Sequence, residues 1–149
     1  MKINTKIRYG LRTMIEIAAN SENCGIFQKD IAKKQEISEK YLDPIISSLK
    51  KAELIVNFKG KKSGYILNKS ASEINVLMII RAMGDNFDVV ECVGPNPLCA
   101  KINACPCRPM WNGLNNVIAN YLKSWFLSEL VTKYKETNKI PEDQMMFFI

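Results

Sequence analysis

The feature that most constrains this fold is a pair of short helical segments separated by a tight polar turn. Apolar residues recur at helical spacing over residues 28–35 and again over residues 38–52. Ser38, at the start of the second segment, is a residue type that commonly caps a helix N-terminus. Two short helices joined in this way are typical of a helix-turn-helix. The sequence therefore predicts this motif, although Pro44 requires a late start or a kink in the second helix.

A basic hairpin follows the two helices directly. The β-prone runs 54–58 and 65–67 flank a polar turn that contains glycine, three lysines and no acidic residue. A hairpin of this charge behind a helix-turn-helix is typical of a wing. With an amphipathic helix expected over residues 5–19 and another over 74–83, the pattern predicts a winged helix-turn-helix DNA-binding domain over residues 1–84.

The second half of the chain has a different character. Residues 85–110 hold four prolines and four cysteines, and we expect an irregular, cysteine-rich sensor loop there. A long helix is predicted from Trp111, with a large apolar and aromatic stripe that suits a dimer seam. A further short helix is expected after Ser128-Glu129, followed by an apolar tail. Residues 111–149 are therefore expected to be a dimerisation helix and C-terminal tail. The fold class is mainly α, with a small β-hairpin wing and a long C-terminal dimerisation helix.

Charge is divided unevenly along the chain. Residues 1–70 hold 14 Lys and Arg against 7 Asp and Glu, whereas residues 71–149 hold 7 against 8. The positive excess therefore lies in the half expected to meet a polyanion. The chain contains no histidine, which excludes a Ser-His-Asp triad, a Cys-His pair and any histidine-ligated metal. Without histidine or a convincing acid–base pair, the chain is not expected to be an enzyme. With no apolar leader or membrane span, we expect a cytoplasmic protein.

The exposed face of the second helix in the motif is expected to enter the major groove of double-stranded DNA. Lys40 can donate to guanine acceptors and Asp43 can accept from the cytosine amino group, so these two are the best candidates for base readout. The alternative is that these are ordinary solvated charges. The remaining candidate DNA contacts, assigned mainly to phosphates, are Lys6, Arg8, Tyr9, Ser38, Glu39, Tyr41, Lys50, Lys51, Lys59, Gly60, Lys61 and Lys62.

Four cysteines form the second constellation: Cys92, Cys99, Cys105 and Cys107. Cytosolic thiols stay reduced, so a disulfide framework is not expected. Structural zinc sites use tighter knuckles than most of this spacing provides. Iron–sulfur clusters tolerate varied spacing between thiolates. Thiol redox sensing without a metal is the third alternative.

The sequence resembles the Rrf family of bacterial winged-helix transcription regulators, of the IscR, NsrR and CymR type. The resemblance covers about residues 1–132, and the order and spacing of its motifs are specific. The matching stretches are Lys6-Ile7-Arg8-Tyr9-Gly10, Asp30-Ile31-Ala32, Ile37-Ser38-Glu39-Lys40-Tyr41-Leu42, Leu49-Lys50-Lys51-Ala52, Lys59-Gly60, Gly64-Tyr65-Ile66-Leu67, Trp111 and Glu129-Leu130-Val131.

The resemblance implies a homodimer that places one winged helix in each half-site of a palindromic operator. It also implies an iron–sulfur cluster, either 2Fe-2S or 4Fe-4S, held by three cysteines that correspond to Cys92, Cys99 and Cys105. The family's usual fourth ligands are absent, because Arg108 and Arg8 stand at those positions. Cys107 is then the candidate fourth ligand, and the hypothesis is a cluster held by four thiolates. The family also favours glycine where this chain has Glu53.

The function expected from these observations is a homodimeric, metal-binding redox sensor whose operator binding depends on an iron–sulfur cluster. A change at the cluster would shift the loop and the dimer helix, and so alter the separation of the two recognition helices. One alternative is the same fold with zinc or bare thiols. Another is a protein-interaction module that docks a partner through its long apolar helix, without specific DNA binding.

Overall fold

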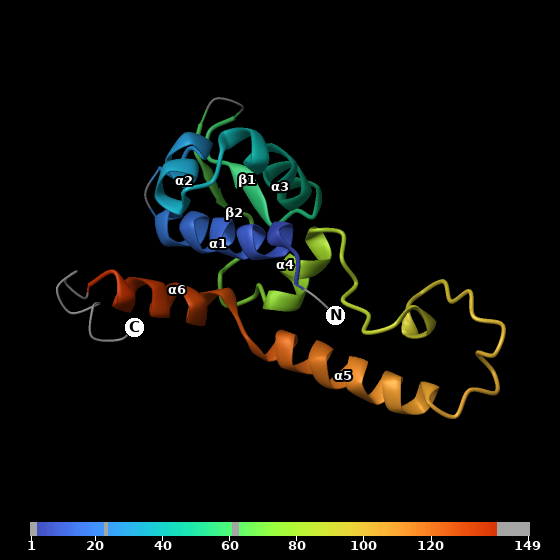
Figure 1. The fold of residues 1–149 in the computed structure, drawn as a ribbon. Helices are drawn as coiled ribbons and strands as arrows, with labels where there is room; N and C mark the ends of the chain where they lie inside the picture. The colour runs from blue at the N-terminus through green and yellow to red at the C-terminus, as the bar shows by residue number, and fades with distance from the viewer. Residues whose placement is uncertain (1–2, 23, 61–62, 140–149) are drawn as a thin grey trace.

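The computed structural model describes residues 3–22, 24–60 and 63–139. The expected elements form in the expected order, and Figure 1 shows a helical body with a small hairpin and a long projecting arm. The helices and strands are α1 (Thr5–Asn20), α2 (Gln28–Gln35), α3 (Glu39–Lys51), β1 (Ile55–Asn57), β2 (Tyr65–Leu67), α4 (Val76–Ala82), the 3₁₀ turn η1 (Glu91–Val93), α5 (Arg108–Ser124) and α6 (Leu127–Thr137).

Local capping sets where the helices begin. The Ser38 hydroxyl accepts a hydrogen bond from the Tyr41 amide at 3.1 Å, which confirms Ser38 as the N-cap of α3. Asn4 and Asn75 cap α1 and α4 in the same way. Because α3 already begins at Glu39, it has no late start and runs through Pro44.

The wing is a two-stranded antiparallel hairpin, with Ile55 opposite Leu67 and Asn57 opposite Tyr65. A short bridge from Tyr65 to Ile26, on the other side of β2, ties the hairpin to the segment before α2. Gly64 allows this close approach, since a Cβ there would lie 2.8 Å from the Ile26 nitrogen. The hairpin is therefore held against the helical body on its inner side.

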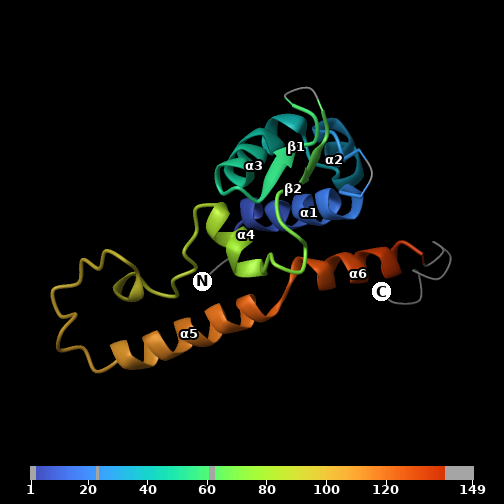
Figure 2. The ribbon, with the colours of Figure 1, turned by 180° about the vertical axis from the view of Figure 1, so that it is seen from behind.

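One hydrophobic core joins the body, and α1 lies at its centre. Helix α1 contacts α2, α3, α4, α6 and β2. Helix α6 lies along α1 in both Figure 1 and Figure 2. The large side chains that are fully buried in this core include Ile7, Met14, Ile17, Ile31, Leu42, Ile45, Leu49, Leu54, Ile55, Ile74, Leu77 and Ile79. Segments from both halves of the sequence thus share one core, because Leu127 and Val131 of α6 are buried in it as well.

Most of helix α5 lies outside this core, and Leu122 near its C-terminal end packs against the core's edge. Both views show it running away from the body, with the segment between α4 and α5 looping around its far end (Figures 1 and 2). No residue of α5 is buried, although the structure describes every one of them. The chain returns through Phe126, and backbone hydrogen bonds join Val76 to Trp125 and Leu127 to Ile74. These bonds anchor the α5–α6 junction to the start of α4.

Two predicted boundaries in this region are wrong. Helix α5 begins at Arg108 rather than Trp111, since Pro109 suits the first turn of a helix. Helix α6 begins at Leu127, and Phe126 rather than Ser128 is its N-cap residue. The Glu129 carboxylate accepts the Phe126 amide at 2.8 Å, which satisfies a donor at the helix start. The apolar tail falls outside the described residues. Within the described ranges, no helix is long and apolar enough to cross a membrane.

Candidate nucleic-acid interface

Helix α3 has two contrasting faces. Its apolar side chains are buried at 4% exposure or less, among them Leu42 and Leu49. Its opposite face is solvent-exposed, as a reading helix requires. The exposed predicted site residues on or beside α3 are Ser38, Glu39, Lys40, Tyr41, Asp43, Lys50 and Lys51. The structure therefore brings these residues onto one accessible surface.

Gln28, at the start of α2, contacts this surface from the side. Its Nε2 donates to Asp43 Oδ1 at 2.6 Å and to the Glu39 carbonyl at 3.0 Å. One carboxylate oxygen of Asp43 is thereby held, while the residue remains exposed to solvent. Gln28 was not among the predicted contacts, because nothing local distinguishes it from any other polar helix residue.

An aromatic contact connects α1 to α3. The rings of Tyr9 and Tyr41 meet edge to face, with centroids 5.3 Å apart and an interplanar angle of 84°. The Arg12 guanidinium lies 5.4 Å from the Tyr9 ring centroid. Arg8 is exposed on the same helix. The start of α1 is thus part of the surface that surrounds α3.

The wing is linked to α3 through Lys50. Its Nζ donates to Asn57 Oδ1 at 3.0 Å and lies 5.8 Å from the Tyr65 ring centroid. Burial, followed by the negative charge of Asp43, raises the pKa of Tyr65 above its ordinary value. The Tyr65 phenol therefore keeps its proton at neutral pH and remains a hydrogen-bond donor.

The tip of the wing is described only in part. Lys59 is exposed, with its Nζ 5.2 Å from the Phe58 ring centroid. Gly60 has φ 94°, a left-handed conformation that glycine adopts without strain. Lys61 and Lys62 lie outside the described residues.

A cavity of about 370 Å³ lies where α1, α3 and the end of α4 meet. Three cations line it: Lys6, Lys51 and Arg81. No acidic side chain lines it among the residues that the structure describes. Lys6 and Lys51 were predicted DNA contacts, whereas Arg81 was missed because it follows Lys51 by a whole hairpin in sequence. We call this feature the cationic cavity.

The cysteine loop, residues 85–107, carries all four predicted ligands between α4 and α5. Each of these cysteines is a free thiol; Cys92 and Cys105 are partly buried, and Cys99 and Cys107 are exposed. Arg108 Nε donates to the Cys92 carbonyl at 3.3 Å, so the two ends of the cysteine-bearing segment lie close together. Cys107 occupies the N-cap position of α5.

The donor chemistry of this loop fits an iron–sulfur cluster, since four free thiols on one segment are the ligands that such clusters take. The described residues do not converge, however: no three Cys, Asp or Glu side chains among them are close enough to share a metal ion. The loop therefore fits a cluster in the type of its residues and in their proximity along the sequence. Ligation would require the loop to bring these thiols together.

The comparisons with known proteins agree with this architecture. IscR, an HTH-type transcriptional regulator of Pectobacterium carotovorum subsp. carotovorum, is 33% identical over 144 residues, which cover 97% of this chain and 87% of the relative. The structure of CymR, the global cysteine regulator of B. subtilis, superimposes with a TM-score of 0.73 at 29% identity, covering 89% of this chain and 98% of that one. The T. potens IscR structure gives 0.72 at 27% identity, with coverages of 92% and 90%.

An exposed helix-turn-helix face beside a two-stranded basic wing defines a winged-helix protein of the DNA-binding class. The family model Rrf2, described as an iron-dependent transcriptional regulator, matches residues 3–133. The chain belongs to the Rrf2 family and is a transcription regulator rather than an enzyme. The resemblance to the Rrf family is confirmed, and the interaction module without DNA binding is not retained.

Proposed function

We propose that this protein is a homodimeric regulator that binds a palindromic operator under the control of an iron–sulfur cluster. The observation that carries the proposal is the direct connection of three segments. The cysteine loop ends at Cys107, the N-cap residue of α5. Helix α5 is followed by α6, which packs against α1 of the DNA-binding body. Any change at the loop therefore meets the helix that we assign to the dimer.

The DNA-binding role rests on α3 and its surroundings. We assign Lys40 and Asp43 to base edges in the major groove, which is supported by the exposure of both side chains on α3. The neighbouring cations Lys50, Lys51 and Lys59 suit phosphate contacts, which position the helix without reading sequence. Two such modules related by a twofold axis would read the two halves of a palindrome.

The dimer role rests on the exposed apolar stripe of α5. Val117 is 65% exposed and Tyr121 is 62% exposed, and Leu114 lies beside them on the same stripe. The opposite face of α5 is polar and lines a cavity against α4, where Asn115 donates to Asp88 and accepts from the Val89 amide. The apolar stripe therefore points away from its own body, toward a second copy.

The cluster role rests on the four loop thiols, Cys92, Cys99, Cys105 and Cys107. When bound, a cluster would supply an iron- and redox-dependent centre at this loop. Arg108 already ties the Cys92 backbone to the start of α5, so closure of the loop acts on the first turn of that helix. The description of the family supports a role for iron, since it names an iron-dependent transcriptional regulator.

The deciding experiment is anaerobic purification followed by metal and sulfide analysis. We expect a brown protein with iron and acid-labile sulfide in comparable amounts, and weaker operator binding, or altered operator choice, after the iron is removed. Cys107→Ala should lose the iron, whereas Cys24→Ala, a change at an exposed thiol outside the loop, should retain it. A colourless protein with stoichiometric zinc would contradict the cluster.

One observation favours a second candidate, control by bare thiols. Cys99 and Cys107 are exposed and are not gathered with their neighbours at a metal-binding distance. A related structure, Staphylococcus aureus CymR, was solved in an oxidized form and matches with a TM-score of 0.68 at 31% identity. If peroxide changes operator affinity equally in iron-free protein, thiol oxidation is the signal and the cluster is not required.

A further inference from the structure

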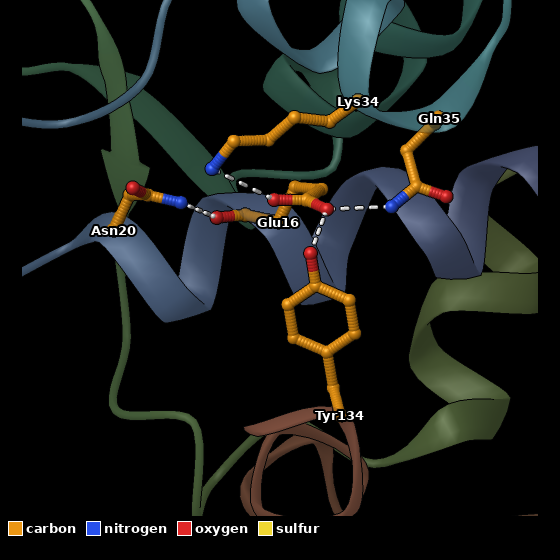
Figure 3. A network of polar contacts seen from close by, with 5 residues as sticks. All are labelled: Glu16, Asn20, Lys34, Gln35 and Tyr134. Carbon is orange, nitrogen blue, oxygen red and sulfur yellow. Dashed lines mark hydrogen bonds and ion pairs between the residues drawn. The ribbon is translucent and has the colours of Figure 1, made fainter. Parts of the chain in front are cut away.

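Among the described residues, one carboxylate is buried, and it lies at the junction of α1, α2 and α6. Glu16, on α1, is fully buried. Its Oε1 accepts a hydrogen bond from Gln35 Nε2 at 2.6 Å and another from the Tyr134 hydroxyl of α6 (Figure 3). Its Oε2 lies 3.7 Å from Lys34 Nζ and accepts no hydrogen bond within the described ranges. A fully buried acid thus holds three helices together.

The network continues from Glu16 toward the DNA-facing surface. Arg12 donates two hydrogen bonds to Gln35, at the end of α2. Arg12 Nε donates to the side-chain oxygen of Gln35 and Arg12 Nη2 to its backbone carbonyl, both at 2.6 Å. Arg12 then lies over the Tyr9 ring, which packs edge to face on Tyr41 of α3. An unbroken series of side-chain contacts therefore leads from α6 to α3, the helix proposed to read DNA.

The physical chemistry of Glu16 makes these contacts interdependent. A buried charge must be compensated by hydrogen bonds or a counter-charge, because desolvation is costly. Lys34 is half exposed and too distant for a hydrogen bond, so it provides only part of this compensation. Gln35 and Tyr134 provide the rest from different helices. If α6 shifts and the Tyr134 hydrogen bond is lost, Gln35 must compensate more of the buried Glu16 charge. Because Gln35 also orients Arg12, the position of Arg12 then changes as well.

The surroundings of Tyr134 favour the protonated form of its hydroxyl. Burial, followed by its hydrogen bond to Glu16 and the charge of that carboxylate, raises the pKa of Tyr134, while a bond to Asn138 opposes the change. The phenol stays protonated at neutral pH and can only donate to Glu16. Removal of this hydroxyl therefore deletes the hydrogen bond to Glu16 and leaves the apolar packing of α6 in place.

We infer that Glu16 is a positioning residue for DNA recognition, which couples the placement of α6 to the Tyr9–Tyr41 pair through Gln35 and Arg12. The inference rests on the proposed operator binding. Helix α6 follows α5, the proposed dimer helix, directly. A movement of α5 can therefore reach α3 through this network within one subunit, in addition to any change in the separation of the two subunits.

The test uses the full-length protein and a palindromic duplex that the wild type selects from a randomised pool. Tyr134→Phe removes one hydroxyl from the network, and Thr132→Val removes one from the exposed side of the same helix. We expect Tyr134→Phe to weaken operator binding by about 5-fold or more, the lower end of typical couplings between sites. Thr132→Val should bind like the wild type.

A double-mutant cycle separates coupling from simple loss of stability. In a Gln35→Leu background, Tyr134→Phe should have little further effect on operator affinity, because the route to Arg12 is already cut. All affinities are compared at a temperature where circular dichroism shows each variant folded. Additive effects, or an affinity for Tyr134→Phe equal to that of the wild type, would overturn the inference.

Glu16 itself gives a second, independent comparison. Glu16→Gln keeps an oxygen that accepts from Tyr134 and Gln35 and should retain most of the operator affinity, whereas Glu16→Leu should lose it. If Glu16→Leu fails to fold, the Tyr134 cycle still decides. Wild-type protein that selects no duplex at all would count against the proposed function. Wild-type binding that none of these variants changes would count against the coupling alone.

Discussion

Glu53 shows how a non-glycine residue can occupy a left-handed backbone position without changing the fold. It lies two residues beyond α3 with φ 58°, a left-handed conformation that costs an ordinary residue about 1 kcal/mol. Glycine adopts this conformation freely, which gives a physical reason for glycine to be expected at this position. The chain turns from α3 into β1 all the same, because Leu54 and Ile55 are buried directly after it.

Replacing Glu53 by glycine should therefore stabilise the protein. We expect Glu53→Gly to raise the free energy of unfolding by up to about 1 kcal/mol, since relief of the left-handed strain exceeds the added entropy of the unfolded chain. Urea denaturation followed by circular dichroism measures the change. The control is Ala52→Gly, where φ is −78° and glycine should instead cost about 0.5–1 kcal/mol. A loss of stability in Glu53→Gly would show that its side chain matters more than its backbone.

Residue-scale predictions from the sequence succeed where the cause is local. The Ser38 cap could be predicted because its partner, the Tyr41 amide, is three residues away. Glu16 could not be, since its partner Tyr134 is 118 residues away. In sequence, Glu16 is one acidic residue in an amphipathic helix, and only packing shows that it is fully buried.

At the scale of elements, the cationic cavity gathers charge from α1, α3 and α4. Its volume of about 370 Å³ and its lining by Lys6, Lys51 and Arg81 suit a backbone phosphate of DNA. The two lysines come from the half of the sequence with excess positive charge. Arg81 comes from the other half, so the charge distribution along the chain does not reveal it.

A charge-removing change tests this cavity as a phosphate contact. Arg81→Gln should weaken binding to operator and unrelated duplex DNA by similar factors, because phosphates carry no sequence information. The slope of log affinity against log salt should fall in magnitude by about 0.9. Lys135→Gln removes an exposed cation from α6, outside the proposed interface, and should leave the slope unchanged. An unchanged slope in Arg81→Gln would exclude the cavity from the DNA interface.

Element boundaries were predictable to different degrees. The bounds of α2 agree with the prediction from periodicity, and those of α1 and α3 agree within about a residue. The predicted starts of α5 and α6 were wrong, because the apolar pattern puts both helix starts too late in the sequence. Pro109 and Glu129 lie in the first turns of the two helices. Boundaries depend on single capping interactions, and these give a weaker signal than a repeated apolar stripe.

At the scale of the whole molecule, α5 carries apolar side chains that its own body does not cover. Exposed apolar stripes on a projecting helix are typical of interaction surfaces, and this supports the proposal that the stripe packs on a second copy. In the proposed dimer, two stripes pack on each other and set the distance between the two copies of α3. The oligomeric state is therefore expected to control operator binding.

A charge placed in the stripe should separate the subunits. We expect Val117→Asp to give a monomer by analytical ultracentrifugation and to weaken operator binding by at least about 10-fold, because a buried unpaired charge opposes association. The control is Asn116→Asp, which adds the same charge on the opposite, polar face of α5 and should remain dimeric. A dimeric Val117→Asp would place the interface elsewhere.

The sequence by itself determined the helix-turn-helix, the wing, the order of the elements and the family. These follow from apolar periodicity, capping and turn residues, which act over a few positions in the chain. Only the tertiary structure decided that Glu16 is buried among three helices, that Arg81 joins Lys6 and Lys51, and that the α5 stripe is left uncovered. Each of these depends on which distant segments meet, and packing of the whole chain around α1 settles that.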